Sequence, residues 1–148
     1  MLEAAGNIWD MECDALCITT NGFVKNSGQA VMGRGIAKQA KEKFLGLEYT
    51  LGLLITNEGN LVHYLIHDTE HDVAIWSFPV KHNWWESAEI DLIVRSCAQL
   101  MYHVEGMNYK RVLLPRPGCG NGGLKWEEVK PTIEQLLDDR ITVVNYAT

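Results

Sequence analysis

Residues 114–126 read LPRPGCGNGGLKW and carry the most informative pattern in the chain. The apolar run Val112-Leu113-Leu114 leads into them and is typical of a buried strand. Pro115 and Pro117 then remove the N–H donors that a continuing strand would need. Glycines at positions 118, 120, 122 and 123 follow, and they let the backbone turn its N–H groups inward. The stretch predicts an anion-binding loop between a strand and a helix, with an ordinary flexible loop as the other interpretation.

Another glycine-containing loop, which comes first in chain order, lies earlier in the sequence. Residues 31–35 read VMGRG and precede a helix predicted over residues 36–44. Ile36, Ala40 and Phe44 share one apolar face of that helix. A lone G-x-G is a weak signal for a nucleotide site, and a glycine that simply begins an ordinary helix is the other interpretation.

The remaining pattern alternates strands with helices. Strands are predicted at residues 2–5, 15–19, 73–78, 111–114 and 141–144, with further helices at 87–104 and 126–137. We expect Pro79 to end the strand at residues 73–78, and Gly106 to end the helix at residues 87–104. Pro131 should lie in the first regular turn of the helix at residues 126–137. A hairpin predicted between residues 53–56 and 61–66 supplies an antiparallel part. The pattern predicts an α/β fold, a three-layer αβα sandwich with a mixed central sheet, formed by one domain over residues 1–148.

Composition limits the class of protein. The 148 residues carry a net charge of −6, which argues against nucleic-acid binding by overall charge while leaving room for a local basic pocket. No apolar run approaches the roughly 20 residues of a membrane span, and the first residues lack a signal-peptide pattern. We therefore expect a cytoplasmic protein with reduced cysteines and no membrane partner. The cysteines form no C-x-x-C pair and the His67–Asp72 cluster is typical of a solvated turn, so neither a metal nor a cofactor is predicted. The sequence leaves the oligomeric state open.

Several candidate functional groups follow strands. Because the carboxyl ends of parallel strands meet at one edge of a sheet, both glycine loops and the strand ends should lie together. Two backbone cradles on one edge suit a diphosphate, and an exposed aromatic ring there could stack on a base. We expect a local basic patch near this edge, formed by Lys25, Arg34, Lys81 and Arg116.

Ordered motifs over nearly the whole chain resemble the macro domain family, which binds ADP-ribose. Residues 6–8, GNI, are similar to the family's G-D-I start, and residues 14–21, DALCITTN, to its D-A-I-V-N-x-x-N strand. Residues 31–37 and 118–124 resemble its first and second phosphate loops. Residues 77–81, SFPVK, followed by His82 and Trp84, resemble the N-F-P-T-K segment of one branch. That branch removes ADP-ribose from nucleic acid or protein and is typified by the DNA ADP-ribosyl glycohydrolase antitoxins.

The resemblance implies a set of site residues. Asn7 takes the place of the Asp that usually reads the adenine amino group, and Tyr146 could stack near adenine. Asn21 would bond the distal ribose, and Lys81 would be the catalytic residue near the anomeric carbon. The Val24–Gln29 segment is longer than in the antitoxins and could cover the distal ribose or contact the linked group. The full set of implied ligand-binding residues is Asn7, Ile8, Thr20, Asn21, Gly33, Gly35, Ile36, Ala37, Gly118, Cys119, Gly120, Asn121, Gly122 and Tyr146.

The identity of the second loop bears on the reaction. A related glycohydrolase pairs its lysine with an Asp in this loop, whereas this chain has Gly122 there, as the DNA-directed antitoxins do. A lone Lys81 could act as an ammonium that stabilises or protonates a leaving group, or as a neutral amine that attacks the opened sugar aldehyde. The resemblance implies a hydrolase acting on an ADP-ribosyl linkage, with ADP-ribose or an ADP-ribosylated substrate as partner and nucleic acid as partner only in modified form. An ADP-ribose-1''-phosphate phosphatase and a non-catalytic ADP-ribose reader are the alternatives.

Overall fold

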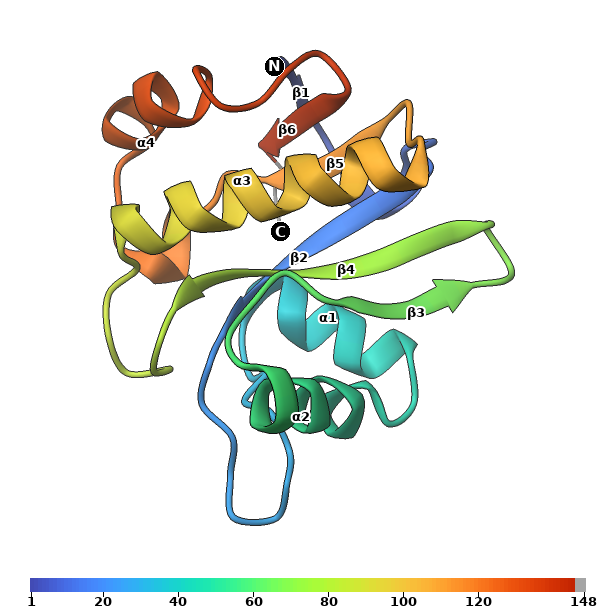
Figure 1. The fold of residues 1–148 in the computed structure, drawn as a ribbon, viewed down its shortest axis with the longest axis vertical. Helices are drawn as coiled ribbons and strands as arrows, with labels where there is room; N and C mark the ends of the chain where they lie inside the picture. The colour runs from blue at the N-terminus through green and yellow to red at the C-terminus, as the bar shows by residue number, and fades with distance from the viewer. Residues whose placement is uncertain (146–148) are drawn as a thin grey trace.

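The computed structural model describes residues 1–145 and contains one mixed sheet (Figure 1). The strand order is β1-β6-β5-β2-β4-β3, and β3 pairs antiparallel with β4 while the other neighbours pair parallel. The predicted α/β class with a mixed sheet is confirmed. The strands are β1 (Leu2–Ala5), β2 (Ala15–Asn21), β3 (Tyr64–Asp68), β4 (Val73–Lys81), β5 (Val112–Pro115) and β6 (Ile141–Asn145).

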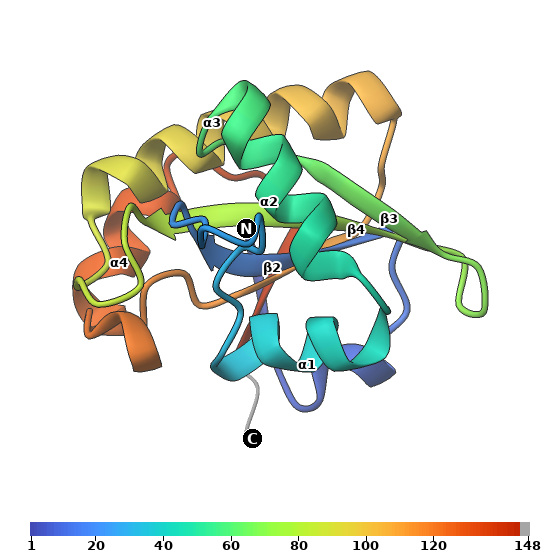
Figure 2. The ribbon, with the colours of Figure 1, turned by 90° about the horizontal axis from the view of Figure 1, so that it is seen from below.

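Helices cover both faces of the sheet, which gives three layers. Buried residues of α1 and α2 share one core cluster with one face of the sheet, and buried residues of α3 and α4 share a second cluster with the other face. Figure 2 shows α1 and α3 on opposite sides of the strands. The helices are α1 (Gly35–Lys43), α2 (Leu47–Glu58), α3 (Ile90–Met107) and α4 (Trp126–Ile133), with short 3-10 turns η1 (Ile8–Asp10) and η2 (Gly120–Gly122). No helix within residues 1–145 is both long and apolar enough to cross a membrane.

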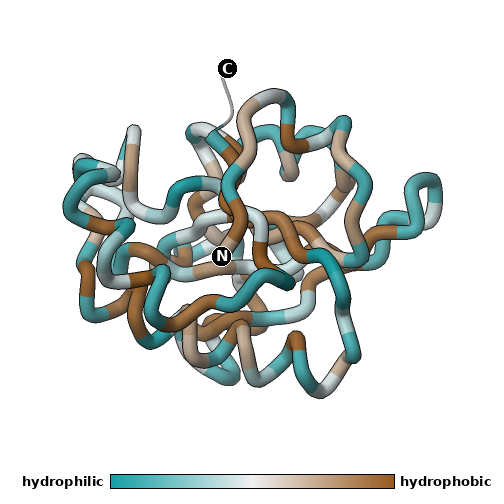
Figure 3. Tube along the Cα trace, turned by 90° about the horizontal axis from the view of Figure 1, so that it is seen from above, coloured by the Kyte–Doolittle hydropathy of each residue, from teal (hydrophilic) through white to brown (hydrophobic). Residues whose placement is uncertain are grey.

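Strand β2 is buried on both of its faces. Leu16 and Ile18 face the core beneath α1 and α2, while Cys17 faces the core beneath α3. This double burial explains the nearly continuous apolar run in its sequence, because a strand covered on one face only would alternate with polar residues. In Figure 3 the hydrophobic segments run through the interior, and the hydrophilic segments gather at the outer turns.

The predicted hairpin between residues 53–56 and 61–66 is wrong. Residues 53–56 belong to α2, and the antiparallel pairing comes from β3 and β4. Leu47 and Leu51, spaced one helical turn apart, are both buried under this helix. Taken alone, the apolar run at residues 53–56 resembles a strand. Considered together with Leu47 and Leu51, it is part of a helical pattern.

Strand β4 continues through Pro79, where the sequence predicts its end. The backbone N–H of Ser77 donates to His63 O on the β3 side, so alternation turns the nitrogen of Pro79 to that same side. Pairing with β3 stops at Tyr64 and Trp76, so the missing N–H leaves no ladder acceptor unsatisfied. The carbonyl of Pro79 accepts a hydrogen bond from Ser96 Oγ at 2.7 Å. As a result the strand reaches Lys81, which lies in register with Asn21 of β2.

Two helix-end predictions are also wrong. Helix α3 passes through Gly106 and ends at Met107, and its C-cap residue Asn108 takes the left-handed conformation at φ 57°. Pro131 lies near the end of α4 rather than in its first turn, because the helix already begins at Trp126. The backbone N–H of Val129 donates to Lys125 O, so regular bonding starts before the proline.

Gly52 provides a stability test of the packing between α2 and residues 22–31. A Cβ built on Gly52 would lie 2.0 Å from Gly28 O and 3.0 Å from Ala30 N, and backbone atoms yield little. We expect Gly52→Ala to lower the free energy of unfolding by about 1–3 kcal/mol, measured by urea denaturation.

Gly106→Ala is the matched control, since Gly106 is also helical but has no atom within 4 Å of the added Cβ. It should raise the free energy of unfolding by about 0.5–1 kcal/mol. Equal effects of the two alanines would contradict the close approach of α2 to the loop.

Candidate functional site

A cleft of about 1050 Å³ opens at the carboxyl ends of β2, β4, β5 and β6. After β2 the chain passes to α1 on one face of the sheet, and after β5 it passes to α4 on the opposite face. Neighbouring strands whose connections leave in opposite directions create a crevice at the sheet edge, the usual ligand position in open α/β sheets. The structure thus brings the strand ends and both glycine loops together at one edge of the sheet, as predicted.

The N-terminus of α1 forms one wall of the cleft. Gly33, Gly35, Ile36 and Ala37 line the cleft there. Arg34 occupies the N-cap position, and its side chain makes no capping hydrogen bond. The first N–H groups of an α-helix lack partners within the helix, and together with the helix dipole they favour an anion. This wall therefore offers backbone donors to a negatively charged ligand.

The second glycine loop forms the opposite wall. Gly118 has φ 77°, a conformation that favours glycine, and a Cβ there would come within 2.8–2.9 Å of the terminal methyl groups of Ile93 and Leu124, which would have to shift. Gly120 has φ 73°, but the space beside it is open. The N–H of Leu124 donates to Gly118 O and that of Ala88 to Gly122 O, which fixes the loop against the lead-in to α3.

The cleft is positively charged in a chain whose net charge is −6. Within residues 1–145, Lys38 forms an ion pair with Glu42 at 3.9 Å, whereas the other four basic side chains of the cleft form none. The guanidinium of Arg116 instead lies over the Trp126 ring, 4.8 Å from its centroid. Such a surplus favours an anionic ligand. The basic residues that line the cleft are Arg34, Lys38, Lys81, Arg116 and Lys125, against the acids Glu42 and Glu127.

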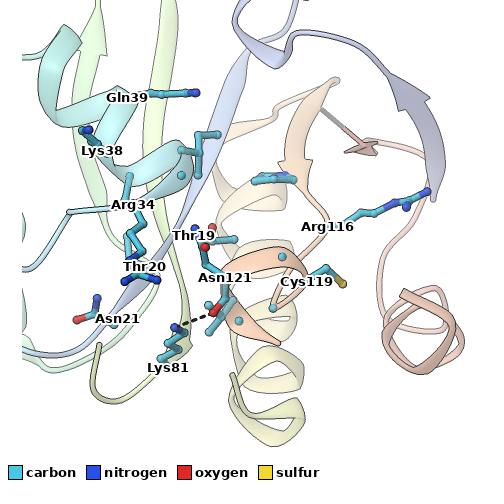
Figure 4. A pocket seen from close by; sticks show the side chains of 18 of the residues that line it. Thr19, Thr20, Asn21, Arg34, Lys38, Gln39, Lys81, Arg116, Cys119 and Asn121 are labelled. Carbon is cyan, nitrogen blue, oxygen red and sulfur yellow. Dashed lines mark hydrogen bonds between the residues drawn. The ribbon is translucent and has the colours of Figure 1, made fainter. Parts of the chain in front are cut away.

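Lys81 lies at one end of the cleft with its amine held by main-chain oxygens. Its Nζ donates to Asn121 O at 3.2 Å, as Figure 4 shows, and also donates to Trp84 O at 3.5 Å. Partial burial lowers the pKa of Lys81 below its ordinary value, and the nearby Arg34 guanidinium lowers this pKa further. No carboxylate in the described part of the chain pairs with this amine.

Thr20 contributes a buried hydroxyl without a partner. The residue is 6% exposed and lines the cleft, and its Oγ1 has no hydrogen-bond partner within residues 1–145. Alternation along β2 places the side chain on the same face as Ile18, which is the face covered by α1. An unsatisfied buried hydroxyl costs about 1–3 kcal/mol in folding stability. A ligand with a polar atom beside Thr20 would supply the missing hydrogen bond.

Asn21 lines the cleft, but both polar atoms of its side chain already have partners. Its Nδ2 donates to Val31 O at 3.0 Å, and its Oδ1 accepts from the N–H of Phe23 at 3.0 Å. These bonds tie residues 22–31 to the end of β2. The ribose contact implied by resemblance remains a prediction, and the structure adds a bracing role for this amide.

Lys25 does not line the cleft, so the predicted four-residue basic patch is wrong at that position. The 22–31 segment folds on itself, with the N–H of Lys25 bonded to Gln29 O and that of Gly28 bonded to Lys25 O. It packs against α2, where the N–H of Ala30 donates to Glu48 O and Gln29 Nε2 donates to the Tyr49 hydroxyl. Packing on α2 holds Lys25 away from the site.

Most of the implied ligand-binding residues line the cleft, and two do not. Ile8 is fully buried, and Asn7 caps η1 by accepting the N–H of Trp9 at 3.1 Å. Tyr146 lies outside the described residues. The implied residues that line the cleft are Thr20, Asn21, Gly33, Gly35, Ile36, Ala37, Lys81, Gly118, Cys119, Gly120, Asn121 and Gly122.

Cys119 lines the cleft as a neutral thiol. Its Sγ lies 3.8 Å from Pro117 O, and burial raises its pKa. A raised pKa keeps the thiolate fraction low, which argues for packing rather than nucleophilic attack.

Sequence reasoning did not predict several cleft residues. They come from the first turns of α1 and α4 and from the ends of the strands. There the hydrophobic pattern of a helix or strand shows which face is buried, but it does not show which of the exposed residues border a cleft. The clearest missed signal is the helix start after each glycine loop, because the first turn of such a helix borders the loop. These residues include Thr19, Lys38, Gln39, Lys125, Glu127 and Asn145.

Sequence comparison finds relatives that are longer than this chain. A DNA ADP-ribosyl glycohydrolase of Thermus aquaticus is 27% identical over 138 residues, which is 90% of this chain and 36% of that protein. The protein of the same name from Mycobacterium tuberculosis is 28% identical over 150 residues, 90% of this chain and 39% of that protein. The chain thus spans little more than a third of the length of these relatives. No family model matches it.

Structure comparison finds macrodomains. The macrodomain of Thermus aquaticus DarG superposes with a TM-score of 0.79 at 25% identity and covers 99% of this chain and 97% of that one. Thermosipho africanus DarTG in complex with ADP-ribose gives a TM-score of 0.80 at 18% identity, over 99% of this chain and 42% of that one. The resemblance indicated by the ordered motifs is confirmed, and the chain is a macrodomain in its fold.

Proposed function

We propose that this macrodomain hydrolyses an ADP-ribosyl linkage, with nucleic acid as the carrier of the ADP-ribosyl group. The observation that carries the proposal is a lysine without an acidic partner at the end of a positively charged cleft walled by two glycine loops. The relatives named DNA ADP-ribosyl glycohydrolase support DNA as the carrier. The net charge of −6 means that the modified group, rather than the bulk charge of a nucleic acid, provides the main recognition.

The two cleft walls suit the diphosphate of ADP-ribose. The first N–H groups of α1 would bind one phosphate, and the N–H groups of Gly120 and Asn121 would bind the other. Within residues 1–145 neither of these two loop N–H groups donates a backbone hydrogen bond, so both are available to a ligand. Thr20 would add a hydroxyl donor on the α1 side. The sugar linked to the second phosphate would then reach the end of the cleft where Lys81 lies.

Lys81 can act by two routes. As an ammonium it would stabilise or protonate the departing group. As a neutral amine it would attack the anomeric carbon, and the bond from that carbon to the carrier would break, with the carrier leaving with the electron pair and taking up a proton. The sugar ring would then open to give an imine with Lys81, and water would hydrolyse this imine to release ADP-ribose and restore the amine. The lowered pKa of Lys81 increases the neutral fraction at a given pH and so helps the second route.

Two alternative functions use the same cleft. An ADP-ribose-1''-phosphate phosphatase requires no lysine–carboxylate pair, which fits the glycine at position 122. A non-catalytic reader would bind ADP-ribose and leave every substrate intact. Release of phosphate from ADP-ribose-1''-phosphate, without release of ADP-ribose from modified DNA, would identify the phosphatase, and tight binding without any release would identify the reader.

Gly120 tests whether the cleft holds an anion. Gly120→Glu places a carboxylate beside the second wall, and calorimetric titration should show that ADP-ribose binding is abolished. Gly120→Gln is the matched control, because it brings the same bulk and the same strain at positive φ without the charge. Equal loss of affinity in both variants would contradict an anion at this loop.

Thr20 should show opposite effects on stability and binding. Thr20→Val removes an unsatisfied buried hydroxyl at nearly constant shape. The free energy of unfolding of the ligand-free protein should therefore stay the same or rise by up to about 1 kcal/mol. The same change should weaken ADP-ribose binding by roughly threefold to tenfold, the range for one lost hydrogen bond. Thr20→Ser should restore most of the affinity. Unchanged ADP-ribose affinity in Thr20→Val would contradict a ligand contact at this hydroxyl.

Lys81 tests turnover. In Lys81→Ala we expect release of ADP-ribose from modified DNA to fall by at least about a hundredfold, the lower range for a positioned acid or base. Binding of ADP-ribose should persist, and Lys125→Ala, at the N-cap of α4, should lose far less turnover.

Lys81→Arg separates the two routes, since arginine keeps the positive charge but does not form an imine. Retained turnover in this variant would indicate the ammonium route. Unchanged turnover in Lys81→Ala would exclude both routes.

A further inference from the structure

Three aromatic side chains form a continuous surface beside Lys81. The ring centroids of Phe23 and Trp85 are 5.3 Å apart, and those of Trp84 and Trp85 are 5.5 Å apart. Phe23 belongs to the loop after β2, and the tryptophans belong to the loop after β4. Trp84 is 51% exposed and Trp85 is 58% exposed. We call these three residues the aromatic surface.

The aromatic surface continues directly from the cleft. Trp84 lines the cleft, and its carbonyl oxygen accepts a hydrogen bond from Lys81 Nζ at 3.5 Å. If Lys81 acts near the anomeric carbon, as the proposed function requires, the group linked to that carbon leaves the cleft on this side. The aromatic surface is therefore the first part of the protein that the carrier of ADP-ribose meets.

Both loops that present the aromatic surface are held in place. The N–H of Gly22 donates to His82 O at 3.1 Å, which joins the two loops, and the N–H of Glu89 donates to Val80 O at 3.0 Å. The N–H of Phe23 is bonded to the side chain of Asn21. Rings on fixed loops lose little conformational entropy when they bind, so this arrangement is suited to recognition.

Apart from Lys81, the charged side chains on the loop that carries the two tryptophans are acidic, which favours an uncharged, flat partner beyond the cleft. Glu86 and Glu89 lie in the same loop, where Asn83 Nδ2 donates to Glu86 Oε1 at 2.7 Å and His82 pairs with Glu89 at 3.1 Å. These carboxylates repel phosphate groups and acidic peptides. Aromatic rings attract the faces of nucleobases regardless of sequence, and those faces are open only where the bases are unpaired.

We propose that Phe23, Trp84 and Trp85 stack on unpaired nucleobases of the strand that carries the ADP-ribosyl group. This inference rests on the proposed function and adds the part of the substrate beyond the ADP-ribosyl group. Stacking rather than phosphate contact holds the strand, which lets a protein of net charge −6 act on a polyanion. Binding should then depend weakly on salt. The slope of log affinity against log salt concentration should be shallower than about −2, which corresponds to fewer than about three phosphate contacts on a single strand.

The test compares two substrates. One carries ADP-ribose on a single nucleoside, and the other carries it on the same nucleoside within a short single-stranded oligonucleotide. In Trp85→Ala we expect kcat/KM for the oligonucleotide to fall by at least about fivefold, the lower end for one lost stacked base, while kcat/KM for the nucleoside changes little. Phe23→Ala should act in the same direction, and Trp85→Phe should restore most of the loss. Tyr102→Ala is the control, since Tyr102 is an exposed aromatic residue (77%) on α3 that does not line the cleft.

Several results would overturn the inference. They are an equal loss on both substrates, an unchanged ratio of kcat/KM in Trp85→Ala, or a similar loss on an ADP-ribosylated peptide. A second measurement keeps the inference separate from the proposed function. Fluorescence anisotropy of a labelled, unmodified single strand should show weaker binding to Trp85→Ala than to wild type, and a steep salt slope or equal binding would overturn the stacking role. If wild type released no ADP-ribose from either substrate, the proposed function would fail while this binding result still decided the inference.

Discussion

Parallel pairing of β2 with both β4 and β5 is the constraint on which the site depends. Ala15 and Leu16 are bonded to both neighbouring strands, and the pairing with β4 continues to Asn21 opposite Lys81. A strand paired on both edges and buried on both faces has little freedom to shift, because a slip by one residue would turn its core side chains to the wrong face. This register places Thr20 opposite Pro79, and a register shift between Thr20 and Asn21 then brings Asn21 opposite Lys81.

The sequence was sufficient to predict the strands that surround the cleft. The apolar run before Pro115 and the run at residues 15–19 each led to the correct strand, because double burial leaves a continuous apolar signal. The glycine loops were recognisable from their place just before a predicted helix, since a lone G-x-G is a weak signal. Helix α2 was missed because a short apolar run is equally compatible with a strand, and only its relation to Leu47 and Leu51 distinguishes the two.

The details of the site depend on contacts that no local pattern contains. Asn21 bonds Val31 O, a partner ten residues away, and Lys81 Nζ bonds Asn121 O, a partner forty residues away. The unsatisfied hydroxyl of Thr20 could not be predicted from sequence either, because it depends on the absence of a hydrogen-bonding group from other parts of the described chain at that point. Local propensity could identify the loops, but the direction of each polar group required the three-dimensional structure.

The end of β4 illustrates how the fold supports a reactive lysine beyond the regular sheet. Pairing with β3 has already ended at Trp76, so the stretch from Ser77 to Lys81 needs other supports on that side. Asn60 supplies one by donating its Nδ2 to Lys81 O at 3.0 Å, while on the opposite side the N–H of Gly22, directly after β2, donates to His82 O. A Cβ on Gly22 would come within 2.6 Å of the Asn60 side chain, so this glycine is needed for the close approach of both supports. Fixing the main chain on either side of Lys81 holds this residue at the cleft, where the main-chain oxygens of Asn121 and Trp84 accept hydrogen bonds from its amine.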